Sequence, residues 1–245
     1  MGRKRPKNLK IQPLVKFSFW DLTYGYENST NDFKFAPDDV LIHLAWPSLN
    51  NFDSINHLEH LDMHFKSLRI LFNLGLKNLI VAGTCLEYGK REGEILPTDK
   101  KNPITNYAIA KCKLHDSLLE LRKTLSFNLQ WMRLFYIKDP DPIKKNLMYQ
   151  LEYALKNNHK EFRMSNGNQL RDFVSLKDIS STVDILLSNK QQTREINCCS
   201  NNPISVKDLV LGYLKNNKKE INIHFGFYEI PYYEGFSFWG VSGLL

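Results

Sequence analysis

The chain has 245 residues, of which 42% are hydrophobic and 24% are charged, and its formal net charge is +7. This length suits a single α/β unit with a buried core, and no apolar run approaches the roughly 20 residues that span a bilayer. The basic start, residues 1–10, lacks the apolar stretch of a signal peptide, so we expect a cytoplasmic protein with no membrane partner. Its lysines are interspersed with acidic residues, which favours a solvated basic surface over a nucleic-acid-binding one.

Short apolar runs alternate with longer amphipathic runs along the first part of the chain. We predict strands over residues 14–22, 39–45, 78–83 and 128–134, and helices over 54–74 and 104–124. Strands that alternate with helices pair in parallel through right-handed crossovers, so the sequence predicts an α/β fold with a doubly wound parallel sheet, Rossmann-like in type.

The pattern changes after Pro140. Helices are predicted over 142–157 and 206–215, and the segment 225–239 is aromatic and irregular. We therefore expect a smaller lobe that binds a substrate, formed by residues 141–170 and 200–245. We expect residues 1–140 to form the larger, Rossmann-like lobe, to which residues 171–199 return.

The sequence predicts no metal site. No C-x-x-C spacing occurs among the cysteines, which are Cys85, Cys112, Cys198 and Cys199. Three histidines share one face of the predicted helix over 54–74, but no carboxylate or cysteine is placed to complete a ligand set with His57, His60 and His64. We expect these to be ordinary solvated or interface histidines.

The sharpest local signal is a tyrosine and a lysine four residues apart near the start of a predicted helix, namely Tyr107 and Lys111. Residues i and i+4 lie on one helix face. An ammonium group near a phenol favours the phenolate, which lowers the tyrosine pKa from about 10 toward the range of a working general acid–base. A surface tyrosine stacked on a lysine is the alternative interpretation, because such pairs also occur by chance.

A threonine, Thr84, comes directly after the predicted strand over 78–83. Catalytic groups of open α/β sheets gather outside the carboxyl ends of the strands. We therefore expect the Thr84 hydroxyl to bind a substrate carbonyl alongside the Tyr107 hydroxyl.

Several segments, taken in order, resemble the extended short-chain dehydrogenase/reductases, the epimerase/dehydratase group that acts on nucleotide sugars. The resemblance runs from about residue 21 to residue 239, and its segments are VLIHLA (40–45), GTCLEYG (83–89), YAIAK (107–111), RLFY (133–136), RDFV (171–174) and NCCS (197–200).

This resemblance implies hydride transfer at a sugar carbon, with NAD or NADP as cofactor and a nucleotide-diphosphate sugar as substrate. It implies catalytic roles for Thr84, Tyr107 and Lys111, and a homodimeric assembly. The cofactor-binding residues that it implies are Asp21, Leu22, His43, Leu44, Ala45, Tyr107 and Lys111. The substrate-binding residues are Thr84, Cys85 and Arg171, whose guanidinium suits a diphosphate.

The reaction type is narrowed by the residues after Thr84. Family dehydratases carry Asp-Glu there, whereas this chain has Cys85 and Leu86, neither of which is a carboxylate acid. The GTCLEYG segment and the later PYYEGFSFWG segment (231–240) look most like 4-keto-6-deoxysugar reductases, which implies a place in polysaccharide biosynthesis. A nucleotide-sugar epimerase is the alternative, and an inactive member that only binds is another.

The family's G-x-x-G-x-x-G motif, whose backbone N–H groups approach the cofactor pyrophosphate, is missing from this sequence. Strand one, its helix and most of strand two are expected to be absent, so that the chain is an N-terminally truncated fragment. We expect weak NAD(P) binding as a result, and an exposed edge on the strand over 39–45.

Overall fold

The computed structural model describes residues 34–142 and 145–244. Its centre is a parallel four-stranded sheet in the order β1-β2-β4-β9, formed by β1 (Val40–His43), β2 (Asn78–Thr84), β4 (Asn128–Leu134) and β9 (Arg194–Cys198). Every neighbouring pair in it is parallel. The predicted α/β fold with a parallel sheet is therefore confirmed.

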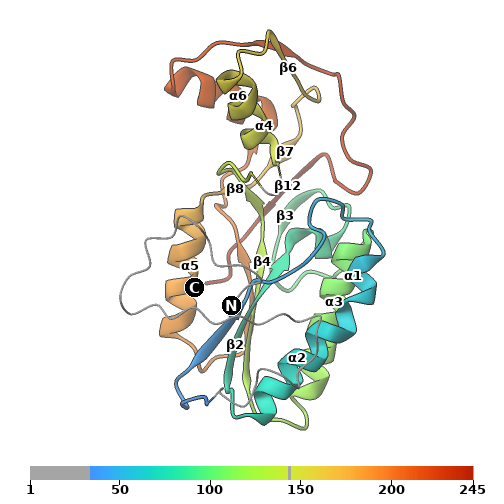
Figure 1. The fold of residues 1–245 in the computed structure, drawn as a ribbon, viewed down its shortest axis with the longest axis vertical. Coiled ribbons are helices and arrows are strands. Elements are labelled where there is room, and N and C mark those ends of the chain that lie inside the picture. The colour runs from blue at the N-terminus through green and yellow to red at the C-terminus, as the bar shows by residue number, and fades with distance from the viewer. Residues whose placement is uncertain (1–33, 143–144, 245) are drawn as a thin grey trace.

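Helices cover both faces of this sheet. The helices α1 (Asn56–Glu59), α2 (Leu61–Asn73) and α3 (Asn106–Leu121) lie on one face, and α5 (Leu176–Ser188) lies on the other (Figure 1). Parallel sheets buried on both faces carry long apolar runs, which is what β2 shows, since all of its residues are buried.

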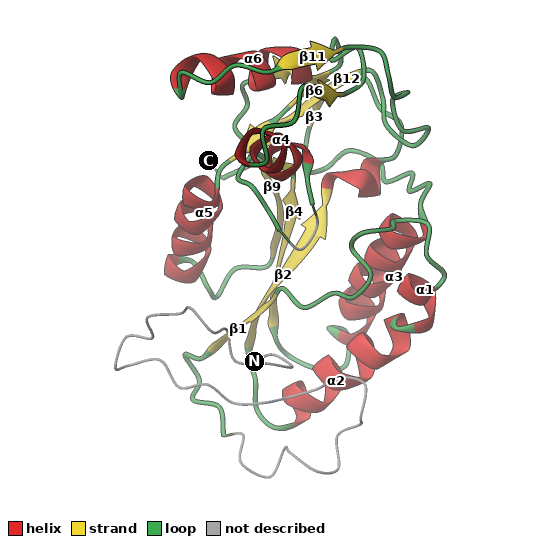
Figure 2. Cartoon of the chain, turned by 45° about the horizontal axis from the view of Figure 1, so that its top comes forward, coloured by secondary structure: helices red, strands yellow, loops and turns green. Residues whose placement is uncertain are grey.

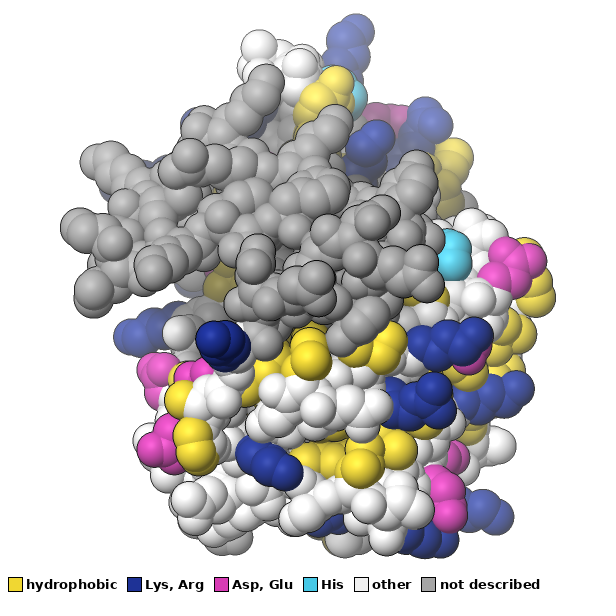
Figure 3. Space-filling view, turned by 60° about the horizontal axis from the view of Figure 1, so that its bottom comes forward, with side chains coloured by type: hydrophobic (Ala, Val, Ile, Leu, Met, Phe, Trp, Pro, Cys, Tyr) yellow, Lys and Arg dark blue, Asp and Glu magenta, His cyan; other side chains and the backbone are white. Residues whose placement is uncertain are grey.

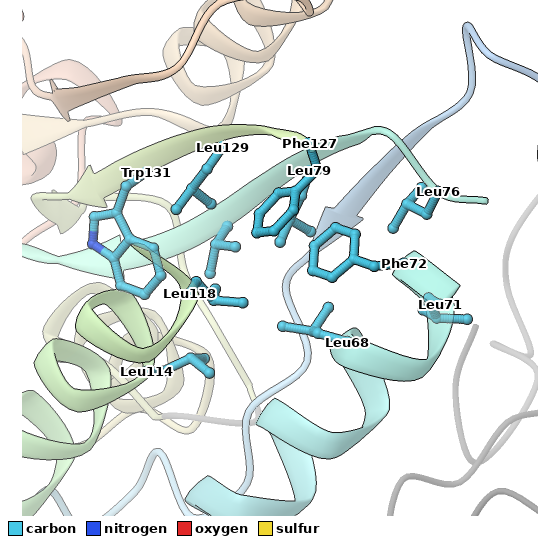
Figure 4. Packing of buried hydrophobic residues seen from close by; sticks show 11 residues of the cluster. Leu68, Leu71, Phe72, Leu76, Leu79, Leu114, Leu118, Phe127, Leu129 and Trp131 are labelled. Atoms are coloured by element: carbon cyan, nitrogen blue, oxygen red, sulfur yellow. The ribbon is translucent and has the colours of Figure 1, made fainter. Parts of the chain in front are cut away.

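Alternation along the strands divides the core into two clusters, because successive side chains of a strand point to opposite faces. Leu79 and Val81 of β2 pack with α2 and α3 residues, whereas Ile80 packs with Leu186 of α5. Figure 4 shows the first cluster, which also contains Leu68, Leu71, Phe72, Leu76, Leu114, Leu118, Phe127, Leu129 and Trp131.

A smaller lobe lies above the carboxyl ends of the central strands (Figures 1 and 2). It contains α4 (Leu147–Lys156), α6 (Val206–Asn216) and the strand pair β6 (Glu161–Arg163) and β11 (Asn222–His224). Its own core is formed by residues of these elements, among them Met148, Leu151, Phe162, Val210 and Leu214.

A second sheet connects the two lobes. Its order is β10-β7-β12-β3, with β10 (Ile204–Ser205), β7 (Leu170–Arg171), β12 (Ser237–Gly240) and β3 (Gly93–Ile95). The remaining pair is β5 (Tyr136–Ile137) with β8 (Phe173–Val174). These short strands bring the C-terminal segment against residues that follow β2.

Some sequence expectations need adjustment. The single helix expected over 54–74 is two helices, α1 and α2, with His60 between them as the cap of both. The strand expected over 14–22 lies outside the described residues. Among those that are described, β1 pairs only with β2, so its other edge has no strand partner there.

The surface charge is mixed. On the described part of the face in Figure 3, Lys and Arg side chains are interspersed with acidic and uncharged groups. None of the helices in the described residues is long and apolar enough to cross a membrane.

Candidate active site

The carboxyl end of β2 turns sharply into a 3-10 helix, η2 (Cys85–Tyr88). Thr84 is its N-cap: the Thr84 hydroxyl accepts a hydrogen bond from the Leu86 N–H at 3.3 Å. In return the Glu87 carboxylate accepts one from the Thr84 N–H at 2.9 Å. This reciprocal capping box fixes Thr84 at the strand end, where the sequence places it.

Tyr107 lies in the first turn of α3, whose N-cap is Thr105. The Tyr107 N–H donates to the carbonyl of Phe52 at 2.9 Å, and its phenol is hydrogen-bonded to the Thr84 side chain. Structure and sequence therefore agree that Thr84 and Tyr107 meet. The side chain is nearly buried, at 9% exposure.

The pKa of Tyr107 differs from expectation. Burial raises it above the ordinary value, and the nearby negative charge of Glu87 adds to that rise, while the hydrogen bond with Thr84 acts in the opposite direction. The expected lowering of the Tyr107 pKa by Lys111 is thus corrected: desolvation outweighs it, and the phenol stays protonated at neutral pH.

Lys111 lies one helical turn after Tyr107 and is 1% exposed. Its ammonium donates to the carbonyl of Ala82 in β2 at 2.7 Å and lies 5.9 Å from the centre of the Tyr107 ring. The indole of Trp46 covers it, with 3.8 Å between the ammonium and the ring centre, a cation–π contact. The amine therefore joins α3 to the same strand end that carries Thr84.

Aromatic side chains from distant segments enclose the Tyr107 ring. Phe52 stacks on it at 5.1 Å between ring centres, and Trp46 meets it edge-on at 6.0 Å. His57 lies 5.2 Å away, and Tyr233, from the C-terminal segment, contacts Phe52. Sequence reasoning missed these four residues, although Trp46 directly follows the HLA segment and was a usable signal.

The histidines behind this enclosure are buried, which corrects the expectation of solvated or interface histidines for His57 and His64. His64 stacks on Trp46 at 4.4 Å, and His57 accepts from the Trp46 indole N–H at 3.0 Å. Burial lowers the pKa of His64 to about 2 and that of His43 to about 3, so both are neutral. Among the described residues no group of three or more His, Cys, Asp or Glu is arranged to hold a metal ion.

Glu87 forms the centre of a buried polar network on the far side of Thr84. Its carboxylate accepts from the Trp131 indole N–H at 3.0 Å and from Nε of Arg133 at 2.7 Å. Arg133 also pairs with Glu195 at 2.5 Å. Because Glu87 is fully buried and bound on all these sides, it does not replace the acid that Cys85 and Leu86 lack.

Two residues that were expected to contact the substrate have their contacts within the protein. Cys85 is buried in an apolar cluster with Tyr88, Ile95 and other residues, and burial raises the pKa of its thiol. Arg171 is 1% exposed. Its five N–H groups are used by Glu234 and by the carbonyls of Leu170, Gly235 and Phe236. Arg171 therefore holds the C-terminal segment, and its guanidinium has no N–H group left over for a diphosphate in this structure.

The described residues fit the reactive end of a dinucleotide cofactor. Tyr107 and Lys111 meet Thr84 at one strand end, and the buried Nε2 of His43 has no hydrogen-bond partner there. Leu44 and Ala45 follow β1 and are exposed. Asp21 and Leu22, the other expected cofactor contacts, lie outside the described residues.

A hollow of about 870 Å³ opens in the small lobe, between α4 and β6. Aromatic and basic side chains line it, including Lys145, Tyr149, Tyr153, Lys160, Arg163 and Tyr228. None of its lining residues belongs to the group around Thr84 and Tyr107.

A Rossmann-like sheet with a Thr–Tyr–Lys group at a strand end defines a class of enzyme, the short-chain dehydrogenase/reductases. The family model described as NAD dependent epimerase/dehydratase family matches residues 6–199, so the chain belongs to that family.

Among curated proteins, the chain is similar to dTDP-6-deoxy-L-talose 4-dehydrogenase (NAD(+)) of Aggregatibacter actinomycetemcomitans. The two are 29% identical over 205 residues, which cover 83% of this chain and 76% of the relative.

Solved structures share the fold at low sequence identity. UDP-glucuronic acid 4-epimerase from Bacillus cereus, in complex with UDP-glucuronic acid and NAD, matches with a TM-score of 0.72 and 21% identity over 83% of this chain and 67% of its own. MoeE5 in complex with UDP-glucuronic acid and NAD has a TM-score of 0.72 and 17% identity over 83% and 70%. RMD from Pseudomonas aeruginosa, complexed with NADPH, has a TM-score of 0.68 and 16% identity over 83% and 72%.

Proposed function

We propose that this protein is a nicotinamide-dependent oxidoreductase that reduces the 4-keto group of a nucleotide-linked 6-deoxysugar. The observation that carries the proposal is the Thr84–Tyr107–Lys111 group, in which two residues of α3 lie against the end of β2. Similarity to a dehydrogenase that acts at position 4 of a dTDP-6-deoxysugar supports the choice of substrate.

The residues of this chain would supply the proton. A nicotinamide, when bound, would supply the hydride for the sugar carbon, because no side chain provides that chemistry. Tyr107 donates its phenolic proton to the carbonyl oxygen as that oxygen becomes a hydroxyl, and Thr84 hydrogen-bonds the same oxygen. Lys111 holds the strand end and places a positive charge near the phenolate that remains.

The raised pKa of Tyr107 fits the proposed role of this residue as a proton donor. A buried phenol that is protonated at neutral pH is ready to donate a proton to a ketone, whereas oxidation of an alcohol needs the phenolate first.

The nucleotide half of the substrate would bind in the hollow of the small lobe. Tyrosine rings such as Tyr149, Tyr153 and Tyr228 offer faces for stacking a base, and Lys160 and Arg163 offer cations for phosphates. This assignment replaces the diphosphate contact first expected of Arg171. A cytoplasmic location and a homodimeric assembly remain predictions from the sequence.

Steady-state oxidation of NADH and NADPH, with dTDP- and UDP-linked 4-keto-6-deoxysugars, tests the proposal. The wild-type chain is expected to oxidise one cofactor, and Tyr107→Phe is expected to lower kcat by about 10² to 10⁴-fold because the proton donor is lost. Tyr213→Phe, which changes a tyrosine of α6 outside both the hollow and the group around Thr84, serves as the matched control and should keep kcat. No turnover by folded wild type with any of these substrates would contradict the assignment.

A nucleotide-sugar 4-epimerase is the second candidate, because an epimerase from Bacillus cereus shares the fold and binds NAD. An epimerase regenerates its cofactor in each cycle. Conversion of a UDP-sugar to its 4-epimer, followed by NMR without consumption of added NADH, would favour this candidate over the reductase.

An inactive protein that binds a nucleotide sugar or a partner without turnover is the third candidate. This candidate predicts that NAD(P) binds weakly. Calorimetric titration with NAD and NADP measures this directly, and micromolar affinity for either would contradict the expectation.

A further inference from the structure

We infer that Glu87 is a positioning residue of this active site: its buried carboxylate holds the peptide of Thr84 in place and sets a fixed negative charge beside the Tyr107 phenol. The inference rests on the proposed function, because it concerns the acid–base group of that reaction. Under this inference Glu87 does not touch the substrate and acts through Thr84 and Tyr107, which the proposed function places in contact with it.

The geometry around Glu87 is that of a residue held in one position. One carboxylate oxygen accepts from the Thr84 N–H at 2.9 Å and from the Trp131 indole at 3.0 Å. The other accepts from Nε of Arg133 at 2.7 Å. The Thr84 hydroxyl is thereby presented from a peptide that Glu87 fixes directly.

The end of β2 is shaped to admit this carboxylate. Gly83 precedes Thr84, and a Cβ at Gly83 would lie 2.6 Å from Oε1 of Glu87 and would overlap the Trp131 indole nitrogen. Only a residue without a side chain lets the carboxylate and the indole lie against the strand.

Glu87 and Tyr107 share Thr84 as a partner: the Thr84 N–H donates to the Glu87 carboxylate, and the Thr84 side chain is hydrogen-bonded to the Tyr107 phenol. Negative charge disfavours the phenolate, and Glu87 is the largest cause of the raised Tyr107 pKa after burial itself. The other titratable or charged groups packed around the phenol are Cys85 of η2, Lys111 of α3, His57 of α1, and Tyr233. The Lys111 ammonium lies 5.9 Å from the centre of the same ring.

Ionisation of the phenol can be followed by 19F NMR with 3,5-difluorotyrosine at position 107, whose phenol is more acidic than tyrosine and titrates at accessible pH. Glu87→Gln keeps the shape and one hydrogen-bond acceptor but removes the charge. We expect the apparent pKa of the fluorinated phenol to fall by about one unit or more, from the loss of a nearby unit charge at low effective dielectric. An unchanged midpoint would overturn the inference.

Glu195→Gln is the matched control. Glu195 binds the same guanidinium of Arg133 but is 37% exposed at its side chain and does not contact Thr84. In Glu195→Gln the titration midpoint of the fluorinated phenol should equal that of the wild-type protein. A shift as large as that of Glu87→Gln would mean that the total charge on Arg133, not the position of Glu87, governs Tyr107, and would equally overturn the inference.

Removing one partner of a buried ion pair can prevent folding. If Glu87→Gln does not fold, the double variant Glu87→Gln/Arg133→Gln removes both charges and leaves neither unpaired. It is expected to lower the midpoint in the same direction, and an unchanged midpoint in a folded double variant would again count against the role of Glu87.

The spectroscopic readout separates this inference from the proposed function, since it needs no turnover. If wild type is inactive but the Glu87→Gln shift is seen, the function fails and the inference stands. If turnover is established but the midpoint does not move, the inference alone fails. With turnover, Glu87→Gln should also move the alkaline fall of kcat to lower pH while KM changes little.

Discussion

At the residue scale, Gly83 is the position at the end of β2 where the surrounding atoms leave no space for a side chain. Its added Cβ would meet Trp131 and Glu87, neither of which can yield easily because both are buried. We expect Gly83→Ala to destabilise the fold by about 1–3 kcal/mol through overpacking. Urea unfolding followed by circular dichroism measures the loss.

Gly212 provides the control for that measurement. It lies inside α6, and a Cβ there would have no atom within 4 Å. Gly212→Ala should stabilise by about 0.5–1 kcal/mol, because alanine favours the helix and restricts the unfolded chain. A Gly83→Ala variant as stable as Gly212→Ala would show that the strand end is looser than the structure indicates.

Arg171 is the residue whose role changes most from sequence to structure. A free guanidinium would affect substrate affinity, but one that binds Glu234 and three carbonyls affects the fold. We expect Arg171→Lys to lower the unfolding free energy by about 3–5 kcal/mol, since one ammonium cannot make five such bonds. A thermal melt checks this, and an unchanged melting temperature with a raised KM would restore the diphosphate role.

The three residues proposed to act in catalysis were predictable for a local reason. Tyr107 and Lys111 are one turn apart, and Thr84 directly follows a continuous apolar run, so local pattern alone indicates them. Phe52 and Tyr233 were not predictable, because they reach the Tyr107 enclosure from segments that only the fold brings together. The acidity of Tyr107 was misjudged since spacing shows a neighbouring charge but not the extent of desolvation.

At the scale of elements, α5 begins at a well-formed cap. The Ser175 hydroxyl accepts from the Asp178 N–H at 3.1 Å, and the Asp178 carboxylate accepts from the Ser175 N–H at 2.8 Å. Ser175→Ala should cost about 1 kcal/mol of unfolding free energy. Urea denaturation tests it, with exposed Ser188→Ala at the other end of α5 as a control that should change stability less.

The Ser175 cap also makes the free energy of unfolding depend on pH, in a direction that the Asp178 pKa determines. Hydrogen bonds from Ser175 lower the pKa of Asp178 in the folded state. The stabilisation is therefore present above the ordinary aspartate pKa and is lost as the pH falls through the lowered value. The gap between wild type and Ser175→Ala should narrow in acid, and a gap that widens there would contradict this cap.

The long central strands were the most predictable elements. β4 is found at the residues predicted for it. β2 extends one residue beyond its prediction, which its continuous apolar run made possible, since such runs mark buried parallel strands. β3, β7 and β12 were not predicted, since they are only two to four residues long and pair with partners far along the chain. The break at His60 was missed because apolar spacing continues across it.

At the scale of the whole molecule, buried neutral histidines make stability depend on pH. Burial lowers the pKa of His43 and His115 to about 3 and that of His64 to about 2. In the unfolded chain each takes up a proton near pH 6.5, so unfolding becomes easier as the pH falls below that value. Each such group contributes about 1.4 kcal/mol per pH unit there.

His64→Phe tests how steeply the unfolding free energy depends on pH, at a position where a phenyl ring should fit. Both His64 ring nitrogens lack a hydrogen-bond partner and the ring stacks on Trp46, so a phenyl ring loses no bond. The unfolding free energy measured from pH 7 to pH 5 should fall less steeply than in wild type. Exposed His159→Gln should keep the wild-type slope, and equal slopes for all three proteins would refute the linkage.

The position of Trp46 has a practical consequence. Its indole lies against the Lys111 ammonium, donates to His57 and stacks on His64, so its surroundings are polar, close and fixed. Any molecule that reaches Lys111 must disturb at least one of these neighbours, and a tryptophan reports such a disturbance in the intensity and colour of its emission. The protein thus carries its own fluorescent probe of occupancy, and ligand screening needs no attached dye.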